Sequence, residues 1–206
     1  MKLFLFDFDG VLVESLDVYY RIVNAALEKI NQPLTGGCEE FLDLFTGNFY
    51  ESLVARGVDL NRFFTASAGP LADVKYQEMK PVAAMPPVVA ELSRNNILVI
   101  ISSNDSKTIR PALEKFGYNG CFQEVWGSDF MLSKKDKMIH ARGKYNISPA
   151  EIYYVGDTTG DIVEGKAAGV KTVGVTWGWH SKEKIAAAHP DYLINDSREL
   201  LKIPSL

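Results

Sequence analysis

Leu3-Phe4-Leu5-Phe6-Asp7-Phe8-Asp9-Gly10-Val11 is the stretch of sequence that decides the fold. Four apolar residues run directly into two carboxylates one residue apart, and a glycine follows. A short apolar run that ends at a turn-forming residue is typical of a buried strand in a parallel sheet. Open α/β folds bind their ligands at the carboxyl ends of such strands. The stretch therefore predicts a central strand that carries Asp7 and Asp9 to the ligand-binding edge of a sheet.

The spacing of the two carboxylates gives the first indication of a metal site. Because side chains alternate along a strand, Asp7 and Asp9 lie on the same side of it. Two carboxylates held together in a buried position repel each other, unless a cation or a proton lies between them. For a single pair of this kind, a strand that simply ends in a polar turn is the better explanation, so the metal site needs support from the rest of the chain.

Further along the chain, apolar strands alternate with amphipathic helices. The apolar run Ile97–Ile101 ends at Ser102-Ser103-Asn104, and the run Ile152–Val155 ends at Gly156-Asp157. Such alternation predicts a doubly wound parallel sheet of Rossmann-like α/β type, to which the first strand also belongs. Shorter strands are expected at 124–127, 172–175 and 192–194, and helices at 88–95, 106–116, 135–145 and 161–168.

The segment between the first strand and this alternating region has helical patterns and no convincing strand. We expect an all-helical cap domain at residues 14–80, inserted into an α/β core of residues 1–13 and 81–206. One cap helix is expected from Asn61, interrupted at Gly69-Pro70, and another from Leu71 to Met79. The proline-rich residues 81–87 are expected to form a stiff connector.

Composition limits the classes of partner. The chain has 206 residues, a net charge of −4 and no basic run, which argues against nucleic acid and anionic membranes as partners. No apolar run approaches a membrane span, and Asp7 and Asp9 come too early for a signal peptide. Cys38 and Cys121 are expected to be free thiols. We expect a cytoplasmic monomer or homodimer.

A second acidic cluster follows the strand 152–155. Asp157 and Asp161 are four residues apart, and Asp161 would lie in the first turn of a helix, where an acid is also a good capping residue. Together with Asp7 at the same sheet edge, they predict an oxygen-rich pocket suited to Mg²⁺. A nearby lysine and hydroxyl would suit a phosphate monoester. There, one aspartate could accept the phosphoryl group and a second could handle the proton.

At this point the chain resembles the haloacid dehalogenase-like hydrolase superfamily, and most closely its phosphoglycolate phosphatase branch with a helical cap. The resemblance covers essentially the whole chain and rests on four motifs in order. The first is DFDGVLVES, from Asp7 to Ser15; the second is the apolar strand that runs into Ser102-Ser103-Asn104. The third is a lysine before a helix, and the fourth is VGDTTGD, from Val155 to Asp161.

The resemblance implies a role for each motif residue. Asp7 would be the nucleophile and a metal ligand, and Asp9 would be the general acid/base, with its backbone carbonyl on the metal. Asp157 would be a ligand, and Asp161 a ligand directly or through water. Ser102 would bind the phosphoryl group, with Ser103 as the alternative. The residues implied in phosphate binding are Phe8, Asp9, Gly10, Ser102, Ser103, Asn104 and Lys134.

The lysine of the third motif is ambiguous. Counting back from the strand 152–155 favours Lys134, with Lys135 and Lys137 as alternatives. The lysines that do not serve in the site are expected to be solvated surface charges. The family often has Lys-Pro here, whereas this chain has Lys-Lys.

The predicted function is a Mg²⁺-dependent phosphatase that hydrolyses a small phosphorylated metabolite, of the phosphoglycolate or sugar-phosphate type, through an aspartyl-phosphate. The acid at position 9 points to phosphate esters, since true dehalogenases resemble this sequence but lack it. Two alternatives remain: a sugar-phosphate mutase of the same family, and a non-enzymatic phospho-acceptor or binding protein.

Three segments give weaker signals. Thr176-Trp177-Gly178-Trp179-His180 follows a strand and borders the expected pocket, with the tryptophans read as packing and His180 as a surface or loop histidine. Thr46-Gly47-Asn48 is the cap loop expected to reach toward the site, because glycine allows close backbone approach. Arg56 is a candidate for a substrate carboxylate, although a helix-end arginine is more often solvated.

Overall fold

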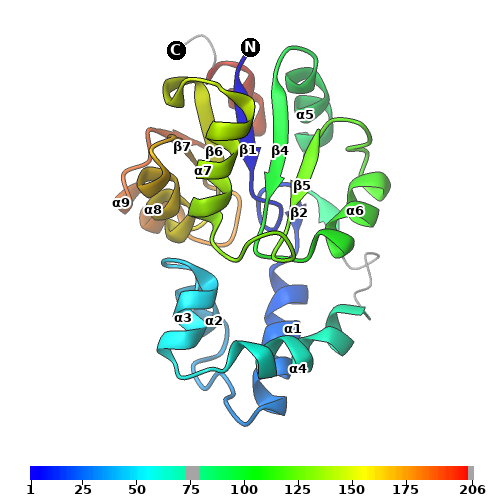
Figure 1. The fold of residues 1–206 in the computed structure, drawn as a ribbon, viewed down its shortest axis with the longest axis vertical. Helices are drawn as coiled ribbons and strands as arrows, with labels where there is room; N and C mark the ends of the chain where they lie inside the picture. The colour runs from blue at the N-terminus through cyan, green and yellow to red at the C-terminus, as the bar shows by residue number, and fades with distance from the viewer. Residues whose placement is uncertain (73–78, 204–206) are drawn as a thin grey trace.

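A six-stranded sheet forms one part of the molecule (Figure 1), in the strand order β5-β4-β1-β6-β7-β8. The computed structural model describes residues 1–72 and 79–203. Every neighbouring pair in this sheet is parallel, which confirms the predicted doubly wound α/β fold. The strands are β1 (Leu3–Phe6), β4 (Ile97–Ile101), β5 (Glu124–Trp126), β6 (Ile152–Gly156), β7 (Lys171–Val175) and β8 (Tyr192–Ile194).

Both faces of the sheet are covered, as the alternating residues of β1 show. Leu3 and Leu5 pack in a cluster with Met138 of α7, whereas Phe4 and Phe6 pack in another with Val89 of α5. All four residues of β1 are fully buried, which explains its uninterrupted apolar sequence. The helices of this part are α5 (Met85–Ser93), α6 (Ser106–Lys115), α7 (Lys134–Tyr145), α8 (Thr159–Ala168) and α9 (Lys182–Ala187), with 3-10 turns at Pro149–Glu151 and Ser197–Leu201.

A helical block lies beyond the carboxyl ends of the strands, at the bottom of Figure 1. Here "helical block" means the described part of the insertion, residues 14–72, which joins the first strand to the rest of the sheet. The buried aromatic and aliphatic side chains of the helical block belong to the same apolar cluster as Phe4 and Phe6. From this arrangement we propose that the chain is divided as the sequence predicts, into an α/β core and a helical cap. Its helices are α1 (Leu16–Lys29), α2 (Gly37–Asp43), α3 (Phe49–Ala55) and α4 (Leu60–Ala72).

The chain crosses between the two parts through a small antiparallel pair, which the sequence did not predict. β2 (Val13–Glu14) pairs with β3 (Lys80–Pro81), so that Val13 lies opposite Pro81. The expectation of no strand in the inserted segment was therefore wrong at Glu14 and Lys80. A strand of two residues is too short to show an alternating pattern.

Two proline predictions also need correction. Pro70 lies inside α4 rather than interrupting it. At this position a proline cannot donate the backbone hydrogen bond to the carbonyl of residue 66. Pro86 and Pro87 lie in the first turn of α5, where the amide hydrogens have no helical partner in any case, so the predicted connector is partly helix. Of the helix expected at 71–79, residues 73–78 lie outside the described residues.

Within residues 1–72 and 79–203, none of the helices has both the length and the apolar composition that a bilayer crossing needs.

Candidate active site

Three carboxylates, two from strand ends and one from a helix, meet at the carboxyl edge of the sheet. Asp7 follows β1 and Asp157 follows β6, and these strands are paired, with the Asp7 amide donating to the Val155 carbonyl at 2.9 Å. Asp161, in the first turn of α8, joins them. One oxygen of each carboxylate lies within 4.8 Å of the others, and all three side chains are buried. The predicted convergence of these acids is present in the structure.

Lys134 is the lysine that lies among these acids. It begins α7, and its buried Nζ donates to Asp7 Oδ2 at 2.6 Å and to Asp161 Oδ1 at 2.7 Å. Burial alone would lower the pKa of Lys134, but the charges of Asp161 and Asp7 raise it above the ordinary lysine value. Lys134 therefore stays protonated and can offset one negative charge of the cluster.

The two neighbouring lysines differ from each other. Lys135 is only partly buried. Lys137 is fully buried and donates from Nζ to the Ser102 carbonyl at 2.5 Å, so the expectation of a solvated surface charge was wrong for it. Burial and the neighbouring Lys134 lower the pKa of Lys137 to about 7. It supports the strand end that carries Ser102 rather than the acids.

Asp161 caps α8, which is one of the two roles that its sequence position predicted; its role as a metal ligand stays a prediction. Its Oδ2 accepts from the Thr158 amide at 3.0 Å and from the Asp157 amide at 3.2 Å, in a capping box that begins α8. Its Oδ1 accepts from Tyr154 at 2.7 Å as well as from Lys134. Burial raises the pKa of Asp161, but the charge of Lys134 outweighs it and the net shift is downward. Both oxygens are thus occupied by protein donors.

Asp157 and Asp9 differ from Asp161, because in the described part of the chain each of them has one carboxylate oxygen without a hydrogen-bond partner. Oδ1 of each is buried without a hydrogen-bond partner among the described residues, while Asp157 Oδ2 accepts from the Trp179 amide at 2.6 Å. Burial, then the charges of Asp161 and Asp7, raise the pKa of Asp157 well above its ordinary value. Burial, then the charge of Asp7, raises the pKa of Asp9 to about 7.

The buried carboxylates carry more negative charge than the Lys134 ammonium can offset, and this excess of negative charge suits a divalent cation. Burial and Asp161 raise the pKa of Asp7 to about 6, even though Lys134 opposes them. Oxygen donors without a partner and a surplus of buried negative charge are what Mg²⁺ requires of a site. Asp7, Asp157 and Asp161 are the side chains that would hold such an ion.

The turn after β1 depends on a glycine. Gly10 has φ +75°, and a Cβ there would lie 2.0 Å from Asp157 Oδ2. Only glycine combines this backbone conformation with so close an approach. The neighbouring Phe8 donates its amide to Asp7 Oδ1 at 2.7 Å, while its ring is buried in the core. The Asp7–Gly10 turn is therefore packed directly against the strand end that carries Asp157.

The predicted phosphate-binding residues after β4 reach the same pocket. Ser102, Ser103 and Asn104 line the cavity that also contains Asp7 and Lys134. The Ser102 hydroxyl accepts from the Asn104 amide at 3.0 Å, and the Ser103 carbonyl accepts from Tyr50 at 2.5 Å. The Asn104 side chain contacts the Tyr19 hydroxyl. Both serines line the cavity, so the two alternatives stay open.

His180 lies in the loop between β7 and α9, as one of the two expectations had it, but it is buried there, so the expectation of a surface histidine was wrong. Its Nδ1 accepts from the Thr159 amide at 3.0 Å, which leaves Nε2–H to donate to the Leu42 carbonyl at 3.0 Å. Trp179 packs against Phe45, as the packing interpretation of the tryptophans predicted, but it also lines the cavity. No local signal in the sequence distinguishes a buried histidine from an exposed one here.

The predicted cap loop contacts the core beside the site. The Gly160 amide donates to the Phe45 carbonyl at 2.9 Å, and Asn48 Nδ2 donates to Glu164 at 3.0 Å. Arg56 instead pairs with Glu40 and is not among the described residues that line the cavity. The loop thus connects the helical block to α8, and Thr46, Gly47 and Asn48 are not among the described residues that line the cavity.

Comparison with known proteins identifies the class. The family model of haloacid dehalogenase-like hydrolases matches residues 4–175, and the chain belongs to this family. A phosphoglycolate phosphatase of Haemophilus influenzae is 29% identical, with 98% of this chain and 97% of that protein covered. One from Synechococcus elongatus is 28% identical over 98% of this chain and 96% of that protein. The predicted resemblance to the phosphoglycolate phosphatase branch is confirmed.

Solved structures agree with this assignment. A predicted phosphoglycolate phosphatase of Haemophilus somnus superposes with a TM-score of 0.74 at 25% identity, covering 99% of this chain and 98% of that one. A predicted phosphatase of Clostridium acetobutylicum gives a TM-score of 0.83 at 20% identity, covering 100% and 99%, and supports the fold alone. The predicted enzyme class, a phosphoric monoester hydrolase, agrees with the names of these relatives.

Proposed function

We propose that this protein is a Mg²⁺-dependent phosphatase that hydrolyses a small phosphorylated metabolite through a phosphorylated Asp7. The observation that carries the proposal is the buried cluster of Asp7, Asp157 and Asp161 with the Lys134 ammonium between two of them. Bound Mg²⁺ would offset the negative charge of the phosphate and of the attacking carboxylate. Asp7, Asp157 and Asp161, with the Asp9 carbonyl, would hold it.

The chain's own residues would perform the two half-reactions. An Asp7 oxygen attacks phosphorus, and the bond from phosphorus to the alcohol oxygen breaks while the Asp9 carboxyl donates its proton to that oxygen. Asp9 then takes a proton from water, whose oxygen attacks phosphorus and breaks the bond to Asp7. Phosphate leaves and the Asp7 carboxylate is restored. Ser102 or Ser103, Asn104, Lys134 and the backbone of Phe8 and Gly10 would position the phosphoryl group.

A panel of phosphate monoesters assayed with Mg²⁺ and with EDTA tests the proposal, starting with phosphoglycolate, on which the relatives are named, and sugar phosphates. We expect phosphate release with Mg²⁺ only, and a loss of at least about 10³-fold in Asp7→Asn. The control is Asp17→Asn, an exposed acid in the first turn of α1, which should behave as wild type.

Other outcomes of the same assay contradict the proposal. Full phosphate release by Asp7→Asn would remove Asp7 as the acceptor. Isomerisation of a sugar phosphate with little release would indicate a mutase, and a phosphorylated Asp7 that persists for minutes would indicate a phospho-acceptor. The cytoplasmic location and the monomeric or homodimeric state remain predictions.

A further inference from the structure

A large cavity lies between the helical block and the sheet edge. Its volume is about 780 Å³, and Asp7, Lys134 and Ser102 form part of its wall. This is within the range of about 300–1,000 Å³ that is typical of sites for drug-sized ligands. A phosphoryl group on a two-carbon acid would fill only a small part of it. The remaining space has to suit the alcohol part of the substrate.

Aromatic rings form a continuous wall along this space. The ring centroids of Trp179 and Phe45 are 5.0 Å apart, and those of Phe45 and Phe49 are 4.9 Å apart and stacked. The series continues from Phe49 to Phe63 at 6.0 Å and from Phe63 to Phe64 at 6.1 Å. All of these residues line the cavity. Such a wall favours a flat apolar group over a hydrated one.

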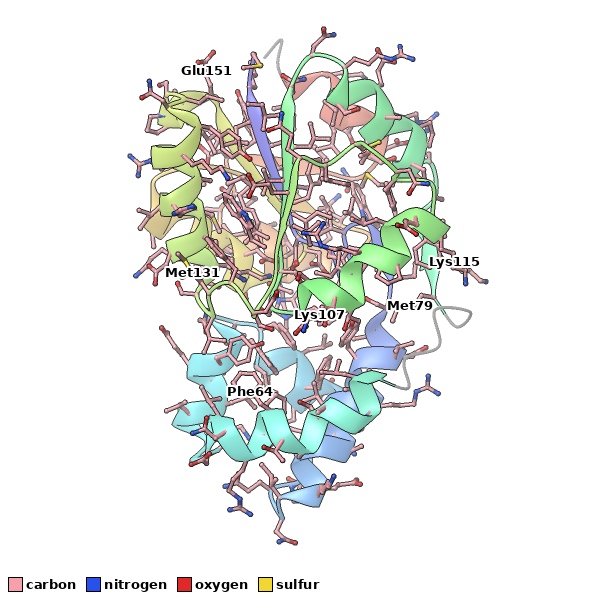
Figure 2. The ribbon with its side chains drawn as sticks, turned by 45° about the vertical axis from the view of Figure 1, so that its right-hand side comes forward. Phe64, Met79, Lys107, Lys115, Met131 and Glu151 are labelled. Atoms are coloured by element: carbon pink, nitrogen blue, oxygen red, sulfur yellow. The ribbon has the colours of Figure 1, made fainter. Side chains whose placement is uncertain are left out.

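Charge on the walls is confined to the core side. Every described cavity residue of the helical block is uncharged. The cations that line the described cavity are Lys134, already paired with Asp7 and Asp161, and Lys107, an exposed residue of α6. Figure 2 shows Lys107 on the core side and Phe64 on the side of the helical block. An anionic alcohol part bound against the aromatic wall would lose water there without a counter-charge from the helical block.

Resting on the proposed phosphatase function, we infer that the substrate is a phosphate monoester whose alcohol part carries an uncharged aromatic ring. The ring binds between Phe49, Phe63 and Phe64 while the phosphoryl group lies at Asp7. If the ring binds there, small anionic esters such as phosphoglycolate are not the preferred substrates.

The test compares kcat/KM, with Mg²⁺, for 2-phenylethyl phosphate, ethyl phosphate and phosphoglycolate. All three are esters of primary alcohols, so the chemistry at the leaving oxygen is similar and the difference reports on binding of the alcohol part in the transition state. We expect 2-phenylethyl phosphate to exceed each of the others by about tenfold or more, as the burial of one phenyl ring implies.

Variants of cavity residues test whether the preference for the phenylethyl ester depends on the aromatic wall. Phe64→Ala should reduce the preference for the phenylethyl ester over the ethyl ester by about threefold or more, because it removes part of the wall. Ala68→Trp, at an exposed cavity residue of α4, should reduce the same ratio by filling the space. Phe64 and Ala68 are both exposed, so we expect both variants to fold as the wild type does. The matched control is Val54→Ala, an exposed apolar residue of α3 outside the described cavity lining, which should leave the ratio unchanged.

Two results overturn this inference and leave the phosphatase function intact: a kcat/KM for phosphoglycolate equal to or above that for the phenylethyl ester, or a wild-type ratio in both wall variants. Absence of phosphate release from all three esters and from the whole panel of phosphate monoesters described above would instead refute the proposed function, and this inference with it.

Discussion

Lys134 is placed where one ammonium group contacts two carboxylates. Its Nζ lies 2.6 Å from Asp7 and 2.7 Å from Asp161, and all three side chains are buried. A buried charge that loses its partner is strongly destabilised, so each of these residues depends on the others. Lys134 thus contributes to the stability of the site as well as to its charge.

Replacement of Lys134 by Met should lower kcat/KM for phosphate release by at least about 10²-fold, the usual effect of removing one preorganised charge from a site of this kind. Lys135→Met is the matched control, since Lys135 is only partly buried, and it should retain activity. Steady-state assays of the purified variants check both. The assignment is wrong if Lys134→Met is active while Lys137→Met is not.

His180 makes stability depend on pH. Burial lowers its pKa below the ordinary value, because the charged ring is disfavoured and Nδ1 must remain an acceptor for the Thr159 amide. The unfolded chain, with a histidine pKa of about 6.5, therefore binds the proton more readily. This contribution to stability is complete above about pH 6.5 and is lost as the pH falls toward the folded-state pKa.

The measurement is the midpoint of thermal unfolding between pH 7.5 and 5. The midpoint should fall less steeply in His180→Asn than in wild type. His189→Asn is the control, because His189 is exposed and has a positive φ that Asn tolerates, and it should follow wild type. Parallel curves for His180→Asn and wild type would contradict the prediction.

At the scale of elements, α8 is one of the core segments that the helical block contacts directly. Its first turn carries Gly160, and a Cβ there would lie 2.3 Å from the Gly47 carbonyl oxygen and 2.7 Å from that of Phe45. Since backbone cannot give way as a flexible side chain does, glycine is required for this contact.

Gly160→Ala should lower the free energy of unfolding by about 1–3 kcal/mol, the usual cost of overpacking. Gly143→Ala is the matched control in another helix, α7, where a Cβ would meet nothing within 4 Å. It should raise the free energy of unfolding by about 0.5–1 kcal/mol, because alanine loses less conformational freedom on folding. Urea unfolding measures both changes. Equal stability of the two variants would show that the contact is not tight.

The elements that were predictable from sequence are those with a strong local pattern. β1, β4 and β6 are uninterrupted apolar runs because they are buried on both faces, and each ends in the polar residues of the site. The convergence of Asp7, Asp157 and Asp161 follows from these strand ends and the parallel order. The family resemblance then supplied the expected roles.

The features that were not predictable depend on contacts between distant segments. β2 and β3 consist of two residues each and exist only because they pair with each other. His180 is buried because the Leu42 carbonyl and the Thr159 amide meet at its ring. Lys137 is buried because it reaches the Ser102 carbonyl. None of these partners is near in sequence, so no local pattern reveals them.

At the scale of the whole molecule, the acidic cluster predicts that Mg²⁺ stabilises the fold. A ligand that binds only the folded state raises the free energy of unfolding by about 2.7 kcal/mol at 100 times its dissociation constant. Thermal unfolding with and without Mg²⁺ should show a clear rise in wild type and little in Asp157→Asn, which loses the carboxylate with an unused oxygen. This readout does not depend on activity.

Asp17→Asn serves as the control and should show the same rise as wild type. An equal rise of the unfolding midpoint in Asp157→Asn would mean that the ion binds elsewhere. No rise in wild type would contradict the prediction of a Mg²⁺ site.

The paired strands β2 and β3 bring the two crossings of the chain together. In an antiparallel pair, opposite residues lie about 5 Å apart, so the helical block leaves the sheet and returns to it at almost one point. Because the two ends of the segment are adjacent, a change in its length between them need not move the strand ends that carry the acids. We therefore expect the length of this segment to vary more readily than the positions of the strand ends.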